Sequence, residues 1–434
     1  MISAEDNVLL TRVGPGTPMG GMMRRYWLPV CTSEQLPRPD APPLHVRLLG
    51  ENFVAFRDSS GRVGLLDEYC MHRRASLVLG RVEDNGIRCL YHGWKFATDG
   101  TVQETPNHCD DRFKASIKAP AYATREAGGL VWAYIGTKDE EPPFQRYEFF
   151  SGPHENRCVF RVNTPANYLQ LFEGGTDSSH VGILHCNLAN PDWKSKPSFV
   201  PEAEDYTSVA LAVGDNAPAL ELENTPYGFH YAAKRRGPFL SDGTSTSSVR
   251  VTAVILPTGR IIPLPQYQFF VFEVPQDDVR TSTYIIAHGP KPFDRAKMRA
   301  VLGLDNERLW NERDCEYRAT AENRYGQDVA RMGETWSGLS GLVPEDASIG
   351  VSMGPIVERH KEMLVAADSA IVRLRARLLE SVRLHMAGKP PLGLMIEDYS
   401  KVRSLADTNV AKGQRWQELV PDNMGPARKT TVMA

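Results

Sequence analysis

Short runs of alternating apolar and polar residues fill the chain between about residues 45 and 136. Glycine and aspartate turn signals separate these runs, which is typical of antiparallel strands joined by tight turns. The pattern predicts a small all-β domain within residues 1–150, preceded by a short helical segment. A proline-rich stretch, DEEPPFQRYEF, then indicates a linker. The strand-like runs are HVRLLG, NFVAFRD, GRVGLLDEY, IRCLYH, KFATDG and GLVWAYIG.

The pattern changes after residue 150, where helix-like and strand-like runs occur together. The strand-like runs lie in the middle of this region, with helix-like segments before and after them. This order predicts a second domain over residues 151–434, with a central antiparallel sheet covered by helices, so that the chain is of the α+β class. The helix-like segments are residues 162–185, 295–326 and 369–388, and the strand-like runs are 227–236, 248–257, 267–275 and 282–290.

Charge and composition exclude several classes of function. The formal net charge of −3 over 434 residues gives no overall basic field for nucleic acid or an anionic membrane. No stretch approaches the roughly 20 unbroken apolar residues of a membrane span, and the N-terminus lacks the basic region and apolar core of a secretory signal. Seven cysteines, an odd number, argue against a disulfide framework and for a reducing compartment. We therefore expect a cytoplasmic protein.

Two Cys/His pairs stand out in the β-type region, Cys70 with His72 and Cys89 with His92. Four such residues could hold zinc, but each pair mixes one cysteine with one histidine on a loop between strand-like runs. A Rieske-type [2Fe–2S] cluster needs two thiolates on one iron and two imidazoles on the other, and two such loops match this demand. The spacing therefore favours an electron-relay cluster, with zinc and a chance grouping of core side chains as alternatives.

A second set of potential ligands follows in the string DSSHVGILH. Asp177 and His180 are three residues apart, so on a helix they would be neighbours. His180 and His185 are five apart and would not point the same way on a regular helix, which must therefore distort or end between them. Gly182 could allow this. Two histidines and a carboxylate form the facial triad of non-haem Fe(II) oxygenases, although a histidine pair on a helix is more often structural.

The two sets together resemble one known family. The string CxH…CxYHGW, with Tyr91 and Trp94, resembles the Rieske signature, whose cysteines and histidines hold the [2Fe–2S] cluster. With D-x2-H-x4-H behind it, the chain resembles the large (α) subunit of Rieske non-haem iron aromatic-ring oxygenases over essentially its whole length. The branch is that of phthalate, chlorobenzoate and phenoxybenzoate dioxygenases and related aryl O-demethylases, on the segments TRVGPGTPMG, RRYWLPV, CMHRRASL and LQLFEGGTDSSH.

The resemblance implies a third iron ligand, an aspartate from a downstream helix. Its closest match is Asp346, in the segment LVPEDASIGVSMGPIVERHKE. Glu345, Asp328 and Asp305 are rivals, and a helix N-cap is the structural alternative for Asp346. The implied cofactors are thus a Rieske [2Fe–2S] cluster and a mononuclear Fe(II) held by the two histidines and this aspartate.

The resemblance also implies partners. Electrons from NADH would arrive through a separate reductase carrying flavin and a ferredoxin-type cluster, since the chain has no flavin or NAD fingerprint and no ferredoxin-like cysteine run. The expected assembly is a homotrimer or two stacked trimers, in which the cluster of one subunit faces the iron of its neighbour. Asp177 takes the family's bridging position and would accept hydrogen bonds from His92 across the interface and from His180 in its own subunit.

Most members of this branch act on aromatic carboxylates, which makes an aromatic acid the expected substrate, with O2 as co-substrate. Ring cis-dihydroxylation is favoured, and O-demethylation is the alternative. An arginine fork suits a buried carboxylate, and Arg235, Arg236 and Arg250 are the candidates, with solvated strand-end charges as the alternative. A zinc-binding protein or a simple electron-transfer protein fits less well, because either would leave the long chain and its histidine motif unused.

Overall fold

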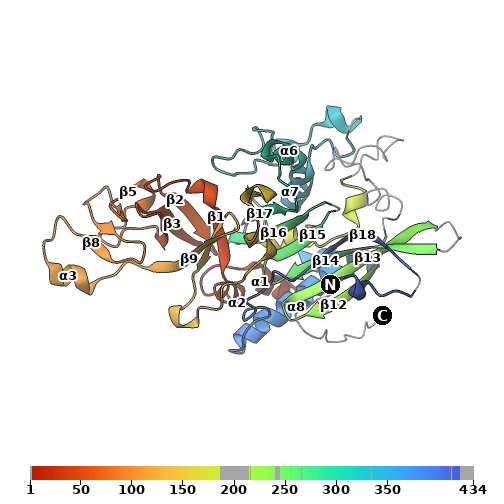
Figure 1. The fold of residues 1–434 in the computed structure, drawn as a ribbon, viewed down its shortest axis with the longest axis horizontal. Helices are drawn as coiled ribbons and strands as arrows, with labels where there is room; N and C mark the ends of the chain where they lie inside the picture. Colours follow the sequence, from red (N-terminus) through yellow and green to blue (C-terminus); the bar gives the residue numbers. More distant parts are fainter. Residues whose placement is uncertain are drawn as a thin grey trace. The chain divides into compact units, whose positions relative to one another are not determined.

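A computed structural model shows the chain as two compact units (Figure 1). One unit is Val13–Phe144, and the other combines Met1–Arg12 with Gln145–Ala434. The N-terminal helix thus groups with the later unit, whereas the sequence pattern assigned it to the first domain. The structure describes residues 2–185, 215, 217–239, 245–264, 266–333, 335–411 and 413–420.

The Val13–Phe144 unit is built on two antiparallel sheets, which confirms the predicted all-β character of this region. Six strands follow the order β1-β10-β9-β4-β3-β2, and four follow the order β5-β6-β7-β8. Apolar side chains from both sheets form one core, and Cys70 and Cys89 are part of it. The bounds are β1 Leu28–Thr32, β2 Leu44–Leu48, β3 Glu51–Arg57, β4 Val63–Asp67, β5 Arg81–Glu83, β6 Gly86–Arg88, β7 Lys95–Phe96, β8 Val102–Glu104, β9 Ala121–Ala127, β10 Leu130–Tyr134, α2 Pro18–Met23 and α3 Asp111–Ser116.

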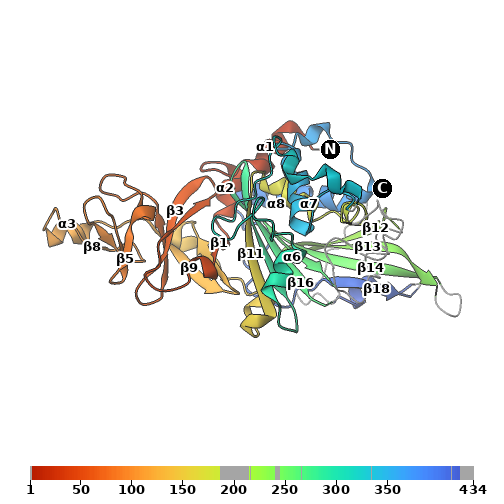
Figure 2. The ribbon, with the colours of Figure 1, turned by 90° about the horizontal axis from the view of Figure 1, so that it is seen from above.

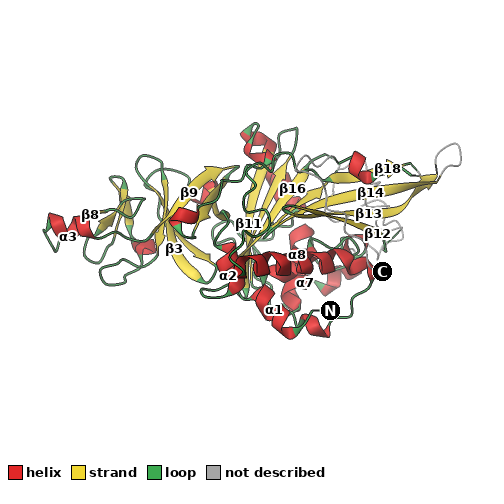
Figure 3. Ribbon diagram, turned by 90° about the horizontal axis from the view of Figure 1, so that it is seen from below, coloured by secondary structure: helices red, strands yellow, loops and turns green. Residues whose placement is uncertain are grey.

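The second unit is built on an antiparallel sheet of eight strands, in the order β11-β17-β16-β15-β14-β13-β12, with β18 paired to β14 (Figure 2). Helices α1, α7 and α8 lie together on one side of this sheet (Figure 3), which confirms the predicted sheet covered by helices. The strands are β11 Arg157–Thr164, β12 Ala219–Thr225, β13 Gly228–Phe239, β14 Ser245–Ile255, β15 Gly259–Pro263, β16 Gln268–Asp277, β17 Arg280–His288 and β18 Leu405–Val410. The helices are α1 Ala4–Thr11, α4 Tyr168–Gly174, α6 Arg295–Val301, α7 Leu342–Ser352 and α8 Ser369–Met386.

Two predicted helices are much shorter than the sequence pattern indicated, whereas the predicted helix at 369–388 is confirmed as α8. In the 295–326 segment, α6 ends at Val301 because Gly303 adopts a left-handed backbone with φ of +71°. The N–H of Leu304 then donates to the carbonyl of Arg299 at 2.9 Å, a pairing typical of a glycine-terminated helix. In the 162–185 segment, only Tyr168–Gly174 is α-helical. None of the helices in the described part of the chain is long and apolar enough to cross a membrane.

Helices α4 and α7 pack against each other although about 170 residues separate them in the sequence. The Gln170 side-chain amide donates to the carbonyl of Gly350 at 2.7 Å. Gly350 has no side chain, which leaves room for Leu171, because a Cβ there would lie 2.6 Å from a Leu171 methyl carbon. This contact brings the segment after α4 close to the first turns of α7.

A buried ion network fixes the end of α4. The Glu173 carboxylate accepts hydrogen bonds from Arg359 at 2.8 Å and from Arg375 at 2.6 Å. Arg359 is fully buried, and the Arg375 and Glu173 side chains are 3% and 8% exposed. Burial raises the pKa of Glu173, but the two guanidinium groups more than offset this and hold it below its ordinary value. The network therefore anchors α4 just before the segment that carries Asp177.

Candidate functional site

The first cysteine loop is closed by main-chain hydrogen bonds. The N–H of Cys70 donates to the carbonyl of Ala75, and the N–H of Arg74 donates back to the carbonyl of Cys70, both at 2.9 Å. Arg74 completes the turn in a left-handed conformation, with φ of +60°. His72 lies between the two bonded positions, so the loop holds both of its potential ligands in one turn.

The second cysteine loop repeats this geometry. The N–H of Cys89 donates to the carbonyl of Trp94 at 2.8 Å, and the N–H of Gly93 donates to the carbonyl of Cys89 at 3.0 Å. Gly93 is left-handed, with φ of +75°, at the position equivalent to Arg74. The two loops are therefore near copies, each with its histidine between the bonded positions.

Like side chains of the two loops lie close together, since the Cys70 and Cys89 thiols interact with each other and the two histidines lie side by side. The imidazole centroids of His72 and His92 are 4.5 Å apart, and His72 stacks on Trp94 with centroids 4.8 Å apart. The buried Nδ1 of His72 has no hydrogen-bond partner in the described part of the chain. Burial, with the nearby Cys89, raises the pKa of the Cys70 thiol to about 11. The Cys70 thiol is therefore protonated without a metal, and it would lose its proton on binding iron. Two thiolates and two imidazoles are the ligands of a Rieske-type cluster.

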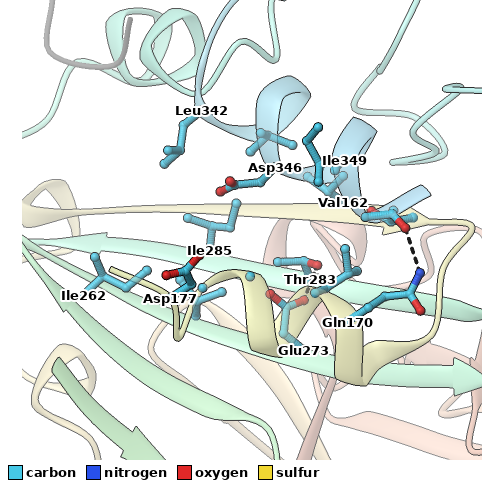
Figure 4. Close-up of a pocket in the computed structure, with 18 of the residues that line it drawn as sticks. Val162, Gln170, Asp177, Ile262, Glu273, Thr283, Ile285, Leu342, Asp346 and Ile349 are labelled. Carbon is cyan, nitrogen blue, oxygen red and sulfur yellow. Dashed lines mark hydrogen bonds between the residues drawn. The ribbon is translucent and has the colours of Figure 1, made fainter. Parts of the chain in front are cut away.

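The second unit brings His180, His185 and Asp346 together (Figure 4 shows Asp346 reaching in from α7). The Nε2 atoms of the two histidines are 3.2 Å apart. The Asp346 Oδ1 lies 3.1 Å from the Nε2 of His185 and 3.6 Å from the Nε2 of His180. The turn after α4 explains the five-residue spacing, because His180–Gly182 form a 3₁₀ turn instead of continuing an α-helix.

These three ligand atoms fit one face of an octahedral metal. Metal–ligand bonds of about 2.1 Å at right angles place ligand atoms about 3.0 Å apart, close to the observed triangle. The electrostatics also favour a cation there. Burial lowers the pKa of His185, but Asp346 and Glu345 raise it to about 10. Burial raises the pKa of Asp346, but His185, His180 and Arg260 bring it below its ordinary value.

A carboxylate lies behind each histidine. Asp177 Oδ2 is 3.4 Å from the Nδ1 of His180, and Glu345 Oε2 is 2.8 Å from the Nδ1 of His185. The hydroxyl of Ser337 donates to the other oxygen of Glu345 at 2.9 Å. Carboxylates in this position fix the tautomer and the ring orientation of a ligating histidine.

The structure separates the candidates for the third ligand. Asp346 faces the Nε2 atoms of both histidines, and Glu345 contacts only the Nδ1 side of His185. Asp305 and Asp328 are exposed and lie outside this group. Burial raises the pKa of Asp177, but His180 and the N–H of Ser179 hold it below its ordinary value, so Asp177 is an anion beside the site.

A cavity of about 170 Å³ adjoins the group of ligands. One wall is a face of the sheet, from strands β11, β15, β16 and β17, and the other comes from α4, α7 and the turn after α4. An engineered apolar cavity of about 150 Å³ holds one benzene molecule, so this space suits a single substituted ring. Much of the lining is apolar, including Val162, Ile262, Phe269, Val271, Ile285 and Leu342.

The three arginines predicted to bind substrate are not among the residues that line this cavity. Arg235 is buried and donates to the carbonyl of Ser178 at 2.9 Å, so it braces the turn beside the histidines. Arg236 is exposed, and Arg250 donates to the carbonyl of Pro263 at 3.2 Å.

Sequence reasoning missed Arg260, which does line the cavity. It pairs with Val271 on the neighbouring strand, and its guanidinium Nη2 donates to Glu273 Oε1 at 2.8 Å. The available signal was an arginine two residues before Ile262 in the apolar run GRIIP, a spacing that puts both side chains on one face of a strand.

Comparison with known proteins identifies the family. Residues 26–118 match the Rieske [2Fe-2S] domain, and residues 133–432 match the domain described as LigXa C-terminal domain like. The chain is 37% identical to the phthalate 4,5-dioxygenase oxygenase subunit of Pseudomonas putida, over 91% of this chain and 89% of that protein. The chain belongs to the Rieske non-haem iron oxygenases. It is an oxygenase subunit, and its cofactors are a Rieske [2Fe–2S] cluster and a mononuclear iron.

Other relatives of this Rieske oxygenase carry out different reactions. It is 41% identical to the 5,5'-dehydrodivanillate O-demethylase oxygenase subunit of a Sphingobium species, over 91% of this chain and 84% of that protein. It is 43% identical to the tert-butanol monooxygenase / tert-amyl alcohol desaturase oxygenase subunit of Aquincola tertiaricarbonis, over 89% of this chain and 78% of that protein. These names describe oxygenase subunits of multicomponent systems, so separate electron-transfer partners and O2 are part of the activity.

Proposed function

We propose that this Rieske oxygenase inserts oxygen into an aromatic carboxylate with a single ring, of the phthalate or chlorobenzoate type. The observation that carries the proposal is the cavity of about 170 Å³ beside His180, His185 and Asp346, because its size and apolar walls suit one ring. The phthalate dioxygenase subunit among the relatives supports this substrate class. A phenoxybenzoate, with two rings, fits this volume less well.

The proposed ligand assignment uses both sites. Cys70, His72, Cys89 and His92 would hold the cluster, and the two histidines with Asp346 would hold the iron. When bound, the cluster supplies electrons singly and the iron supplies the chemistry of O2. In the chain itself, Asp177 and Glu345 orient the two iron-binding histidines. The cavity holds the aromatic ring beside the open side of the triad.

The proposed electron path runs between subunits. Asp177 lies beside His180 with its side chain 20% exposed, so it could also accept a hydrogen bond from His92 of a neighbouring copy. A closed ring of subunits supplies this path to every copy, and we propose that the ring is a trimer or two stacked trimers. The electrons would come from NADH through a separate reductase with flavin and a ferredoxin-type cluster. The sparse cysteines, odd in number, favour action in the cytoplasm.

Cis-dihydroxylation of the ring is the favoured reaction, and O-demethylation of a methoxybenzoate is the second candidate, supported by the O-demethylase relative. Product analysis with ¹⁸O2, a surrogate reductase, NADH and a panel of phthalates, chlorobenzoates, phenoxybenzoates and methoxybenzoates tests both. Two labelled atoms in one diol establish ring dioxygenation. Release of formaldehyde with an unlabelled phenol establishes O-demethylation, because the oxygen from O2 enters the methyl group and leaves with it. If no acid reacts while both metal sites are loaded, the aromatic-acid proposal is wrong.

A further inference from the structure

Among the described residues that line the cavity, Arg260 is a buried cation whose donors are only partly used. Arg260 is 7% exposed, and its Nη2 donates to Glu273 at 2.8 Å. Its Nε and Nη1 are buried and have no hydrogen-bond partner among the described residues. Leaving buried donors unbonded costs about 1–3 kcal/mol each. Because Nε lies against Gly175, Nη1 is the donor suited to a ligand that enters the cavity.

The chain leaves space for this guanidinium at Gly175. A Cβ at residue 175 would lie 2.1 Å from both Nε and Cζ of Arg260. The backbone of Gly175 is ordinary, with φ of −73° and ψ of −3°, so glycine is not required there by conformation. The absent side chain therefore serves to admit Arg260 close to the turn that leads to Asp177.

Glu273 holds Arg260 without saturating it. One Glu273 oxygen accepts from Arg260, and the other accepts from the hydroxyl of Thr283. Glu273 pairs with Thr283 across neighbouring strands, and its side chain is 2% exposed. Both Glu273 oxygens are thus engaged within the protein, and Nη1 of Arg260 is left for an acceptor from outside.

We propose that Arg260 is the residue that binds the carboxylate of the substrate, through the N–H groups of its Nη1. This inference rests on the proposed function and adds the anchoring residue and its supports, Glu273 and Gly175. A guanidinium with several donors in a rigid plane favours a planar oxyanion over a neutral carbonyl, because each hydrogen bond to the anion is charge-assisted. The same cavity holds Asp346 and His180, so an acid anchored here lies in the space that adjoins the iron ligands.

The test measures binding to the reduced, iron-loaded full-length protein without O2, by calorimetry. The probes are phthalate, 3-chlorobenzoate and 4-methoxybenzoate, each compared with its primary amide. Arg260→Gln is expected to weaken binding of the acids by about 10- to 100-fold and of the amides by less than about threefold. Arg260→Lys keeps the charge but loses the planar guanidinium, so it should fall between wild type and Arg260→Gln.

Three further variants make the result specific. Glu273→Gln removes a negative charge beside the bound acid, so it should tighten acid binding. Gly175→Ala displaces the guanidinium and should weaken the acids selectively. Arg308→Gln, which changes an exposed arginine of the same unit in the same way, is the matched control and should change nothing. Iron content and the visible spectrum of the cluster show that each variant is folded and loaded.

The outcomes separate the inference from the proposed function. If folded Arg260→Gln and Gly175→Ala bind and oxidise the acids as wild type does, the anchoring role of Arg260 is wrong and the aromatic-acid function stands. A selective loss in Arg250→Gln instead would give that role to the arginine predicted from the sequence. If wild type binds only the amides or neutral compounds such as tert-butanol, both the inference and the proposed substrate class are overturned.

Discussion

Glu345 offers a sharp test of how the iron site is held. Its carboxylate lies 2.8 Å from the Nδ1 of His185, and both side chains are nearly fully buried, at 2% and 3% exposure. We expect Glu345→Ala to weaken Fe(II) binding by about 10- to 100-fold, because a buried carboxylate that orients a ligating histidine contributes about this much to metal affinity. The loss of one charge-assisted hydrogen bond, about 1.5–3 kcal/mol, gives a similar range.

Graded variants separate charge, hydrogen bond and ligand. Glu345→Gln keeps an acceptor for Nδ1 but removes the charge, so it should weaken Fe(II) binding less than Glu345→Ala. Ser337→Ala removes only the bond to the far oxygen of Glu345 and should have the smallest effect. Asp346→Ala removes an atom of the triangle itself and should abolish Fe(II) binding.

The assay is competition for Fe(II) with a chelator of known affinity under argon, and cluster absorption serves as the folding control. An unchanged Fe(II) affinity in folded Glu345→Ala would refute the positioning role. Complete loss of Fe(II) in Glu345→Gln with normal binding in Asp346→Ala would show that the third ligand is Glu345.

Three further predictions concern stability, the cluster and electron transfer. Glu173→Gln should destabilise the catalytic unit by about 3–5 kcal/mol in urea unfolding, because Arg359 and Arg375 lose their buried counter-charge. The pKa of Glu173 is lowered in the folded state. The difference in unfolding free energy between wild type and variant should therefore be largest above the unfolded-state pKa of about 4.3, and it should shrink as the pH falls through the folded-state pKa. A difference that grows on acidification would contradict this prediction. Cys70→Ser should abolish the red-brown colour and the electron paramagnetic resonance signal of the reduced cluster while the mononuclear iron stays bound, and an unchanged spectrum would exclude Cys70 as a ligand. Asp177→Asn should retain both metals yet largely stop turnover with the reductase, and normal turnover at full metal content would rule out the bridging role.

The cluster site was open to prediction from the sequence because all four of its residues lie within one short segment. Cys70 and Cys89 each have their histidine two or three residues away, and local turns set the geometry of each loop. The same holds for the histidine pair at 180 and 185, where the need for an irregular turn follows from the helical period.

The rest of the catalytic site depends on contacts between distant segments. The choice between Asp346 and Glu345 depends on the docking of α7 on α4, about 170 residues upstream, which no local pattern encodes. The position of Arg260 in the cavity depends on the register of β15 with β16 and on the space left by Gly175. The long helix expected over 295–326 failed for a related reason, because Gly303 and its capping bonds ended α6 where the composition still favoured a helix.

The twin cysteine loops bear on how the protein matures. The bonds that close them run from main chain to main chain, and the left-handed Arg74 and Gly93 complete them without using any sulfur or imidazole atom. The two loops can therefore adopt their folded conformation before the [2Fe–2S] cluster binds. Because the thiols lie in the apolar core and the imidazoles lie partly exposed, we expect the cluster to enter from the side of the imidazoles.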